Sequence, residues 1–230
     1  NHGLLTVNEQ PQWYTVTGGS RVYVQQLRAQ LKEQIRTNTP IVKVKRHLSG
    51  VELIDARGQI YLFDEVVIAT HANEALAMLD KPTTPEHEIL GSFQFQPNDV
   101  VVHQDASFMP RRRSCWASWI YLSETERDKR AVVSLTYWMN LLQGITEKLP
   151  LFITLNPGRA PAASQIYDKH VFSHPVFNAQ TLLAQQRLPE IQGKNRIWFV
   201  GAWQRYGFHE DGLLSAVNVA ARMGITPPWT

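Results

Sequence analysis

Hydrophobic and polar positions change their spacing along this 230-residue chain. Apolar residues recur at every third or fourth position in Val24, Leu27, Leu31 and Ile35. This spacing is typical of an amphipathic helix, and Ser20 is a suitable N-cap residue at its start. The pattern therefore predicts a helix over residues 21–31, directly after the Gly18-Gly19 pair.

Between residues 41 and 63 the spacing is two, in segments 41–46, 51–55 and 60–63. Alternation of this kind predicts three short antiparallel strands. The next apolar segment, ending at Thr70, is unbroken, which indicates a strand that is covered on both faces as in a parallel sheet. A helix over about residues 73–79 is predicted after it.

A second region begins after Lys81-Pro82-Thr83-Thr84-Pro85, which we interpret as a hinge. Its alternating segments predict a mostly antiparallel sheet with strands at 100–103, 115–122, 132–138 and 151–155. After Gly193, a further unbroken apolar strand ends at Gly201, and a helix is predicted over 211–223. The predicted fold class is therefore α/β and α+β: a doubly wound domain from residues 1–80 and 194–230, with residues 81–193 inserted as a second domain.

Composition narrows the class of protein. Apolar residues make up 43% of the chain and aromatic residues 10%, which is enough to bury a core. A net charge of +3 gives no reason to expect a nucleic-acid partner. The single cysteine, Cys115, excludes an internal disulfide and a multi-thiolate metal site; we expect it to be a small buried hydrophobic residue in a reducing, cytoplasmic compartment. The histidine spacings match no standard metal site, so we expect no metal.

Candidate chemistry lies where the two unbroken strands end. The block from Gly201 to Ala216 combines a strand end, a glycine-containing loop and a helix rich in serine and alanine. Small residues let the backbone approach a flat ligand, and free N–H groups at a helix start attract electron-rich oxygens. The alternative is that Glu210 and Asp211 only cap the helix. Ala69 and Thr70 end the other strand, and ligands of such sheets bind beyond strand ends. We therefore predict that the two ends lie side by side.

Four ordered blocks carry a resemblance to a known family: residues 13–24, 69–72, 103–119 and 201–212. They resemble the flavin-containing amine oxidase superfamily, and within it the bacterial predicted NAD/FAD-binding proteins that are amine oxidase-like. The resemblance implies an FAD-binding domain assembled from residues 1–80 and 194–230 and an inserted substrate-binding domain, residues 81–193. The family's first segment, Gly-x-Gly-x-x-Gly, has no match in these residues. We expect it upstream, so that this chain is the C-terminal portion.

The resemblance also implies cofactor contacts. It places Ile41 at the adenine, Ala69 and Thr70 beside the ADP portion, and Gly201 and Ala202 near the ribitol. Phe208 would face the isoalloxazine, with the helix start near the pyrimidine edge of the flavin; these residues are Glu210, Asp211, Gly212 and Leu213. Two positions depart from the family, since Ala202 replaces a common Asp and Asp211 a common Gly. Cys115 lies far upstream of the last motif, so the expected FAD is non-covalent, and this portion alone could lack it.

Catalytic and substrate contacts are predicted as follows. Phe208 and His209 are the catalytic candidates, and the substrate-binding candidates are His103, Arg111, Trp116 and Trp119. His103 and Asp105 form either an acid/base pair or a turn-capping Asp beside a surface His. The Arg111–Arg113 run either binds an anionic group or is solvated.

The functional hypothesis is an FAD-dependent oxidoreductase that takes a hydride from a C–N or C–C bond, and a desaturase or isomerase acting on a lipid stays open. The alternative is a non-catalytic module that holds no flavin and binds a protein or lipid surface through Arg111–Arg113. Expected partners are a small-molecule or lipid substrate, with a peripheral membrane contact left open and no nucleic acid. The sequence leaves the oligomeric state undetermined.

Overall fold

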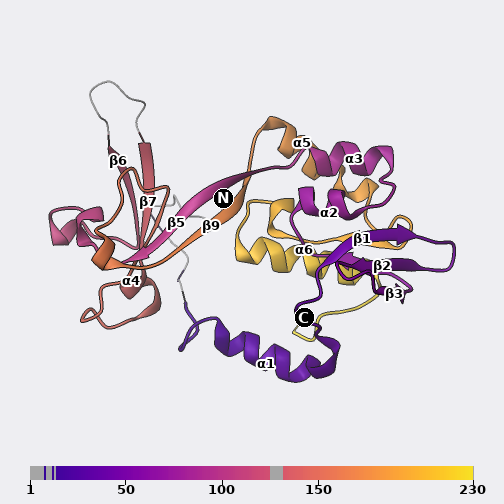
Figure 1. Cartoon of the computed structure of the whole chain (residues 1–230), viewed down its shortest axis with the longest axis horizontal. Helices are drawn as coiled ribbons and strands as arrows, with labels where there is room; N and C mark the ends of the chain where they lie inside the picture. Colours follow the sequence, from indigo (N-terminus) through magenta and orange to yellow (C-terminus); the bar gives the residue numbers. More distant parts are fainter. Residues whose placement is uncertain (1–7, 9–11, 13, 125–131, 230) are drawn as a thin grey trace. The chain divides into compact units, whose positions relative to one another are not determined.

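The computed structural model describes residues 8, 12, 14–124 and 132–229, so Trp13 of the first family block lies outside the described residues. The chain forms two compact units. Figure 1 labels their helices and strands and colours them along the sequence. Unit 1 contains Asn1–Ile35 and Pro97–His174, and unit 2 contains Arg36–Gln96 and Pro175–Thr230. The boundaries predicted after residues 80 and 193 thus fall inside unit 2.

Unit 2 contains two small sheets. The period-two segments form an antiparallel meander in the order β1-β2-β3, as predicted. The two unbroken apolar segments pair with each other as parallel strands β4 and β10. The strands are β1 (Ile41–Arg46), β2 (Val51–Asp55), β3 (Ile60–Phe63), β4 (Val66–Ile68) and β10 (Ile197–Phe199).

Helices complete unit 2. They are α2 (Ala72–Met78), α3 (Thr84–Gly91), α5 (Ala179–Arg187) and α6 (His209–Arg222), with short 3-10 turns η5 (Leu188–Glu190) and η6 (Ala202–Gln204). α2 and α6 match predicted helices closely, whereas the sequence pattern did not predict α3 and α5. Both belong to the core of unit 2, because Leu90 and Ala184 are buried in the same cluster as Ile68 and Phe199. This packing places the segments on either side of the predicted boundaries in one core.

The predicted hinge is the start of α3. The Thr83 hydroxyl accepts a hydrogen bond from the Glu86 backbone N–H, and the Glu86 side chain accepts one from the Thr83 backbone N–H, which forms a capping box. Pro85 fits in the first turn, where no helical N–H bond is needed. The buried Glu86 carboxylate also pairs with Arg46 at 2.5 Å, which joins β1 to α3.

Unit 1 contains a five-stranded antiparallel sheet with the order β6-β7-β8-β5-β9 (Figure 1). The strands are β5 (Gln94–His103), β6 (Trp119–Glu124), β7 (Val132–Trp138), β8 (Phe152–Leu155) and β9 (Ile166–Val176). An antiparallel sheet was predicted here, but β9 was not. Most of β9 is exposed and polar, so it lacks the apolar alternation that reveals a strand.

One face of this sheet carries the core of unit 1. Thr136 opposes Thr154, and Phe152 opposes His103, and all four side chains are buried. The short elements are η2 (Ala106–Phe108), η3 (Arg113–Cys115), α4 (Met139–Gln143) and η4 (Ala163–Gln165). Phe108 and Met109 are buried, and Met109 packs with Trp138 and Phe152.

The predicted N-terminal helix is α1 (Arg21–Leu31), followed by the turn η1 (Lys32–Gln34). Its bounds agree with the prediction, yet Val24, Leu27 and Leu31 are exposed. Ser20 precedes α1 with helical backbone angles, and its side chain caps no N–H of the described residues. The prediction of Ser20 as a side-chain N-cap was therefore wrong.

Candidate functional site

The two strand ends that the sequence singled out lie side by side. β4 and β10 are parallel, with Val66 opposite Ile197 and Ile68 opposite Phe199. The Val200 N–H continues the pairing by donating to the Ile68 carbonyl at 3.0 Å. Because the strands are parallel, both carboxyl ends reach the same edge of the sheet. The prediction that the two strand ends lie side by side is confirmed.

The two outer edges of this strand pair differ. On β10, the Gln192 side chain accepts from the Phe199 N–H at 2.9 Å and donates to the Phe199 carbonyl at 2.7 Å. Gln192 thus substitutes for a neighbouring strand. On β4, pairing to β10 uses Val66 and Ile68, so the backbone groups of Val67 point away from β10. Within the described residues no other strand pairs with β4, and Val67 is exposed.

The turn after β10 requires a glycine. Gly201 has a φ of 156°, and a Cβ atom there would collide with the Trp203 indole. Its N–H donates to the Ser215 hydroxyl at 2.9 Å, and that hydroxyl donates to the Gly212 carbonyl at 2.7 Å. Ser215 therefore ties the end of β10 to the first turns of α6.

Trp203 joins the two strand ends across the turn. Its indole N–H donates to the Thr70 carbonyl at 3.1 Å, and its ring meets the edge of Phe93 at a centroid distance of 4.6 Å. The side chain is buried, and the Gln185 amide donates to its backbone carbonyl at 3.0 Å. No role was predicted for Trp203, Ser215 and Gln192. The partner of Trp203 lies 133 positions away, and the bonds of Ser215 to Gly201 and of Gln192 to Phe199 span 14 and 7 positions across turns, so the spacing of apolar residues does not reveal them.

The start of α6 is fixed by Asp211. Its buried carboxylate accepts hydrogen bonds from the N–H groups of Phe208 at 3.0 Å and Tyr206 at 3.3 Å. The Phe208 carbonyl in turn accepts from the N–H groups of Asp211 and Gly212. Asp211 is thus a capping residue. The N–H groups of Asp211 and Gly212 are therefore already used by the chain's own turn.

The structure brings most of the predicted cofactor residues together in unit 2. Ala69 and Thr70 are exposed at the end of β4, while Gly201 and Ala202 are half-buried after β10. Around the start of α6, Phe208, His209, Glu210 and Leu213 are exposed. Ile41 begins β1 and packs against the same core. Their contact with a cofactor stays a prediction.

Comparison with known families identifies the chain. The sequence model described as flavin containing amine oxidoreductase matches residues 3–138, which is more than half of the chain. The protein belongs to this family. The recognition made from the four sequence blocks is confirmed.

Solved structures agree with this flavin amine oxidoreductase fold. A CLA-producing fatty acid isomerase from P. acnes has a TM-score of 0.62 at 13% identity, covering 90% of this chain and 52% of its own. A UDP-galactopyranose mutase has a TM-score of 0.59 at 10% identity, and the match covers 90% of this chain and 52% of the mutase. A cyclohexylamine oxidase from Brevibacterium oxydans IH-35A has a TM-score of 0.55 at 11% identity, and the match covers 90% of this chain and 53% of the oxidase.

The predicted fold class is confirmed by these structures, and this flavin amine oxidoreductase chain spans about half the length of each. Comparison with curated proteins gave no match. In the part of the chain that the structure describes, no group of three or more His, Cys, Asp or Glu residues could hold a metal ion. Among the same residues, no helix combines the length and apolar character that crossing a membrane requires.

The substrate-binding candidates of this family member all lie in unit 1. Arg111 is exposed, and Trp119 on β6 is partly exposed. The Trp116 indole N–H donates to the Pro110 carbonyl at 2.8 Å, and its ring meets the edge of Trp138. Cys115 is exposed, so its prediction as a buried residue was wrong. It sits in the short turn η3 and not in the predicted strand, which begins only at Trp119.

Arg113 acts as a structural clamp. Its guanidinium carbon lies 3.7 Å from the ring centre of Trp116 and 4.3 Å from that of Trp138. The same group pairs with Glu147 at 2.6 Å. Within the predicted basic run, Arg113 is therefore already occupied by partners of its own unit.

His103 is fully buried, and the expectation of a surface His was wrong. Its Nδ1 accepts from the Asp105 N–H at 3.1 Å, so Nε2 carries the proton and donates to the Thr154 hydroxyl at 2.8 Å. Thr154 lies 2.8 Å from the Thr136 hydroxyl. Asp105 caps η2 through the Ser107 N–H, as the turn-capping interpretation predicted. The structure thus places His103 in the core of unit 1, away from any face open to a substrate.

Substitution at Gly201 tests the turn after β10. We expect Gly201→Ala to lower the free energy of unfolding by about 1–3 kcal/mol, because its φ is strained for alanine and the new Cβ meets Trp203. The matched control is Gly212→Ala, whose Cβ would make ordinary contacts at 3.7 and 3.8 Å with Ala202; it should be neutral or stabilising by up to ~1 kcal/mol. Urea unfolding measures the stability of both variants. Equal effects of the two substitutions would contradict the requirement for glycine at position 201.

His103 predicts a pH dependence of stability. Burial lowers the pKa of His103 below its ordinary value of 6.5; Arg159 lowers it further, and Asp105 acts in the opposite direction. Below pH 6.5 the unfolded chain takes up a proton that the folded chain does not, so stability falls on acidification. The difference in unfolding free energy between the natural protein and His103→Gln should therefore shrink as the pH drops below 6.5, by at most ~1.4 kcal/mol per pH unit. A difference that is flat with pH in this range would show that His103 does not titrate in this way.

Proposed function

We propose that this chain is part of an FAD-dependent oxidoreductase that moves a hydride from a C–N or C–C bond to non-covalently bound FAD. The observation that carries this proposal is the parallel pairing of β4 with β10, with the start of α6 tied to the end of β10. Membership of the flavin containing amine oxidoreductase family supports it. Since the chain spans about half the length of the matched structures, the activity of the whole protein is part of the proposal.

The residues at the strand ends fit one part of an extended cofactor. Ala69, Gly201 and Ala202 have little or no side chain, so a ligand can approach their backbone. The positive end of α6 favours electron-rich oxygens of a flavin ring. The sequence offers no Gly-x-Gly-x-x-Gly loop for the pyrophosphate, so a complete site requires additional chain.

Bound FAD would supply the hydride acceptor, and the chain would supply orientation. The Phe208 ring is 37% exposed beside the start of α6, which leaves it accessible to a planar ligand. Asp211 binds the Phe208 N–H and thereby fixes the backbone from which this ring projects. His209 and Glu210, also exposed, are the nearest candidates for proton exchange with a substrate.

The proposed substrate is a small molecule or lipid with an apolar body. Trp119 and Tyr121 share one face of β6 and are partly or largely exposed, and their partners on β7 are Tyr137 and Leu135. This aromatic row in unit 1 suits an apolar ligand. The names of two matched proteins, a fatty acid isomerase and a cyclohexylamine oxidase, keep both C–C and C–N chemistry as candidates.

The second candidate is a flavin-free module that binds a protein or lipid surface. It rests on the basic run, where Arg111 and Arg112 are exposed. Arg113 is held against Trp116 and Trp138 and is paired with Glu147, and this ion pair reduces the charge that the run can offer a partner. The oxidoreductase is therefore the better supported proposal. A cytoplasmic location and the absence of a nucleic-acid partner stay predictions from composition.

The flavin spectrum of the full-length protein tests the main proposal. We expect a purified full-length preparation to be yellow, with the two absorption bands of oxidised flavin and FAD close to one per chain. Denaturation should release the FAD, because no cysteine lies near the last motif. A colourless full-length preparation that takes up no added FAD would favour the flavin-free module.

Phe208→Ala in the full-length protein tests the assigned ring contact. We expect it to weaken FAD binding by about two- to tenfold, the range for losing one aromatic contact, and to slow flavin reduction by substrate. Titration of the FAD-free protein and anaerobic stopped-flow absorbance measure the two effects. Phe172→Ala, at an exposed aromatic residue of β9, is the matched control and should change neither. If Phe208→Ala binds FAD as tightly as the natural protein and its flavin is reduced at the same rate, Phe208 does not contact the flavin ring.

A further inference from the structure

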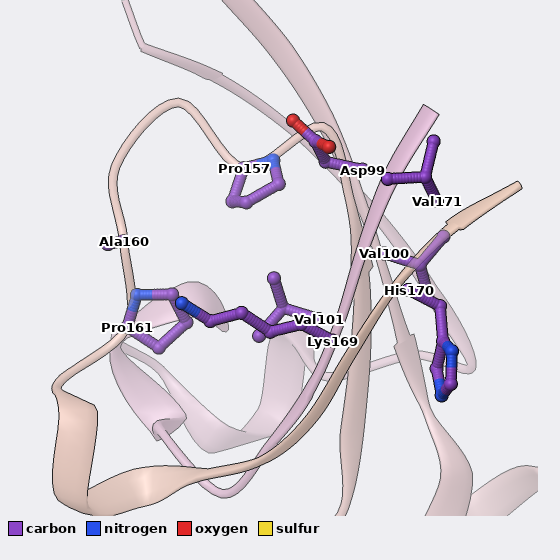
Figure 2. Close-up of a pocket in the computed structure, with 9 residues that line it drawn as sticks. All are labelled: Asp99, Val100, Val101, Pro157, Ala160, Pro161, Lys169, His170 and Val171. Carbon is purple, nitrogen blue, oxygen red and sulfur yellow. The ribbon is translucent and has the colours of Figure 1, made fainter. Parts of the chain in front are cut away.

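We infer that unit 1 contains a second small-molecule site, which takes a compound with an ammonium group and a carboxylate group at opposite ends of an apolar body. The site is a hollow of about 490 Å³ between β5, β9 and the loop at residues 157–161. Figure 2 shows Val101 at its base, with Pro157 and Pro161 on the loop side. Its volume is within the range of known small-molecule sites.

The first end of the loop is fixed to β5. The Asn156 N–H donates to the Asp99 carbonyl at 2.8 Å, and the Asp99 N–H donates to the Asn156 side-chain oxygen at 3.0 Å. The Asn156 amide also donates to the Asn98 side chain at 2.7 Å. Asn156 has a φ of 46°, a conformation that asparagine tolerates better than most residues. These bonds hold the backbone beside Asp99 in one arrangement.

The middle of the loop is fixed by Arg159. Its guanidinium donates to the Ser107 carbonyl at 2.9 Å and lies 4.1 Å from the ring centre of the buried Phe108. Pro157 and Pro161 further restrict the backbone on either side. The loop wall is therefore preorganised, which lowers the entropic cost of binding a ligand.

Opposite charges lie at the two ends of this hollow. In Figure 2 the Asp99 carboxylate lies beside Pro157, whereas the Lys169 side chain runs past Val101 toward Pro161. Both side chains are exposed, and no ion pair joins either of them to another described residue. Asp168, the neighbour of Lys169, instead binds His170 at 2.8 Å.

This arrangement defines the chemical class of the ligand. A carboxylate on the ligand pairs with Lys169, an ammonium group pairs with Asp99, and methylene groups between them contact Val101 and the proline rings. The two charges also determine the orientation of the ligand, because each end of the hollow repels the group that the other end attracts. The site lies wholly within unit 1, so it does not depend on the proposed flavin chemistry.

Titration calorimetry with compounds of graded length tests the inference. The probes are 4-aminobutanoate, 6-aminohexanoate and 8-aminooctanoate, with hexanoate and hexylamine as one-ended controls. We expect affinity to pass through a maximum at one length, and the one-ended compounds to bind about tenfold more weakly than the best probe. Equal binding of one-ended and two-ended compounds, or no binding of any probe, would overturn the inference.

Matched variants locate the site. Lys169→Met and Asp99→Asn should each weaken binding of the best probe by about tenfold, because each removes one charged partner. Asp99→Asn retains the backbone bonds to Asn156, and far-ultraviolet circular dichroism checks that both variants fold. Lys148→Met, at another exposed lysine of unit 1, should bind as the natural protein does. The same loss in Lys148→Met would reveal a general charge effect and overturn the assignment.

Discussion

The site in unit 2 depends on one interaction, the parallel pairing of β4 with β10 between segments about 130 positions apart in the chain. Three side chains stabilise this pairing at its end. Trp203 bonds to the carbonyl of Thr70, Ser215 accepts from Gly201, and Gln192 completes the outer edge of β10. Phe199 is fully buried, so losing Gln192 would leave the Phe199 N–H without this partner, which is costly inside a core. The geometry of the two strand ends is thus set by buried side chains of unit 2.

Sequence reasoning was accurate where the apolar pattern of a segment depends directly on the burial of that segment. The unbroken apolar runs at β4 and β10 indicated strands covered on both faces, and the two strands do pair in parallel. The edge strand β9 was missed, because its exposed polar residues show no alternation. His103 was misjudged as a surface residue, since its burial depends on Thr154 and Phe152, which lie about fifty positions later. Long-range packing of this kind leaves no trace in local spacing.

The same contrast applies to charged residues. Asp211 was an ambiguous residue in the sequence, and only the N–H groups of Phe208 and Tyr206 identify it as a cap. Arg113 belonged to a basic run that suggested an anion site, yet its guanidinium lies against the rings of two tryptophans. In both cases the side chain stabilises its own loop, and Asp211 thereby also fixes the backbone of Phe208. A charge in the sequence therefore predicts a role only when its partners are known.

The exposed side of β4 has a consequence for handling the protein. Val67 presents an N–H and a carbonyl away from β10, next to an apolar side chain that solvent reaches. Such an edge can recruit any extended backbone, including that of an identical molecule. A preparation of these 230 residues alone should consequently form more dimers and larger species as its concentration rises, and a charged residue in place of Val67 should suppress them.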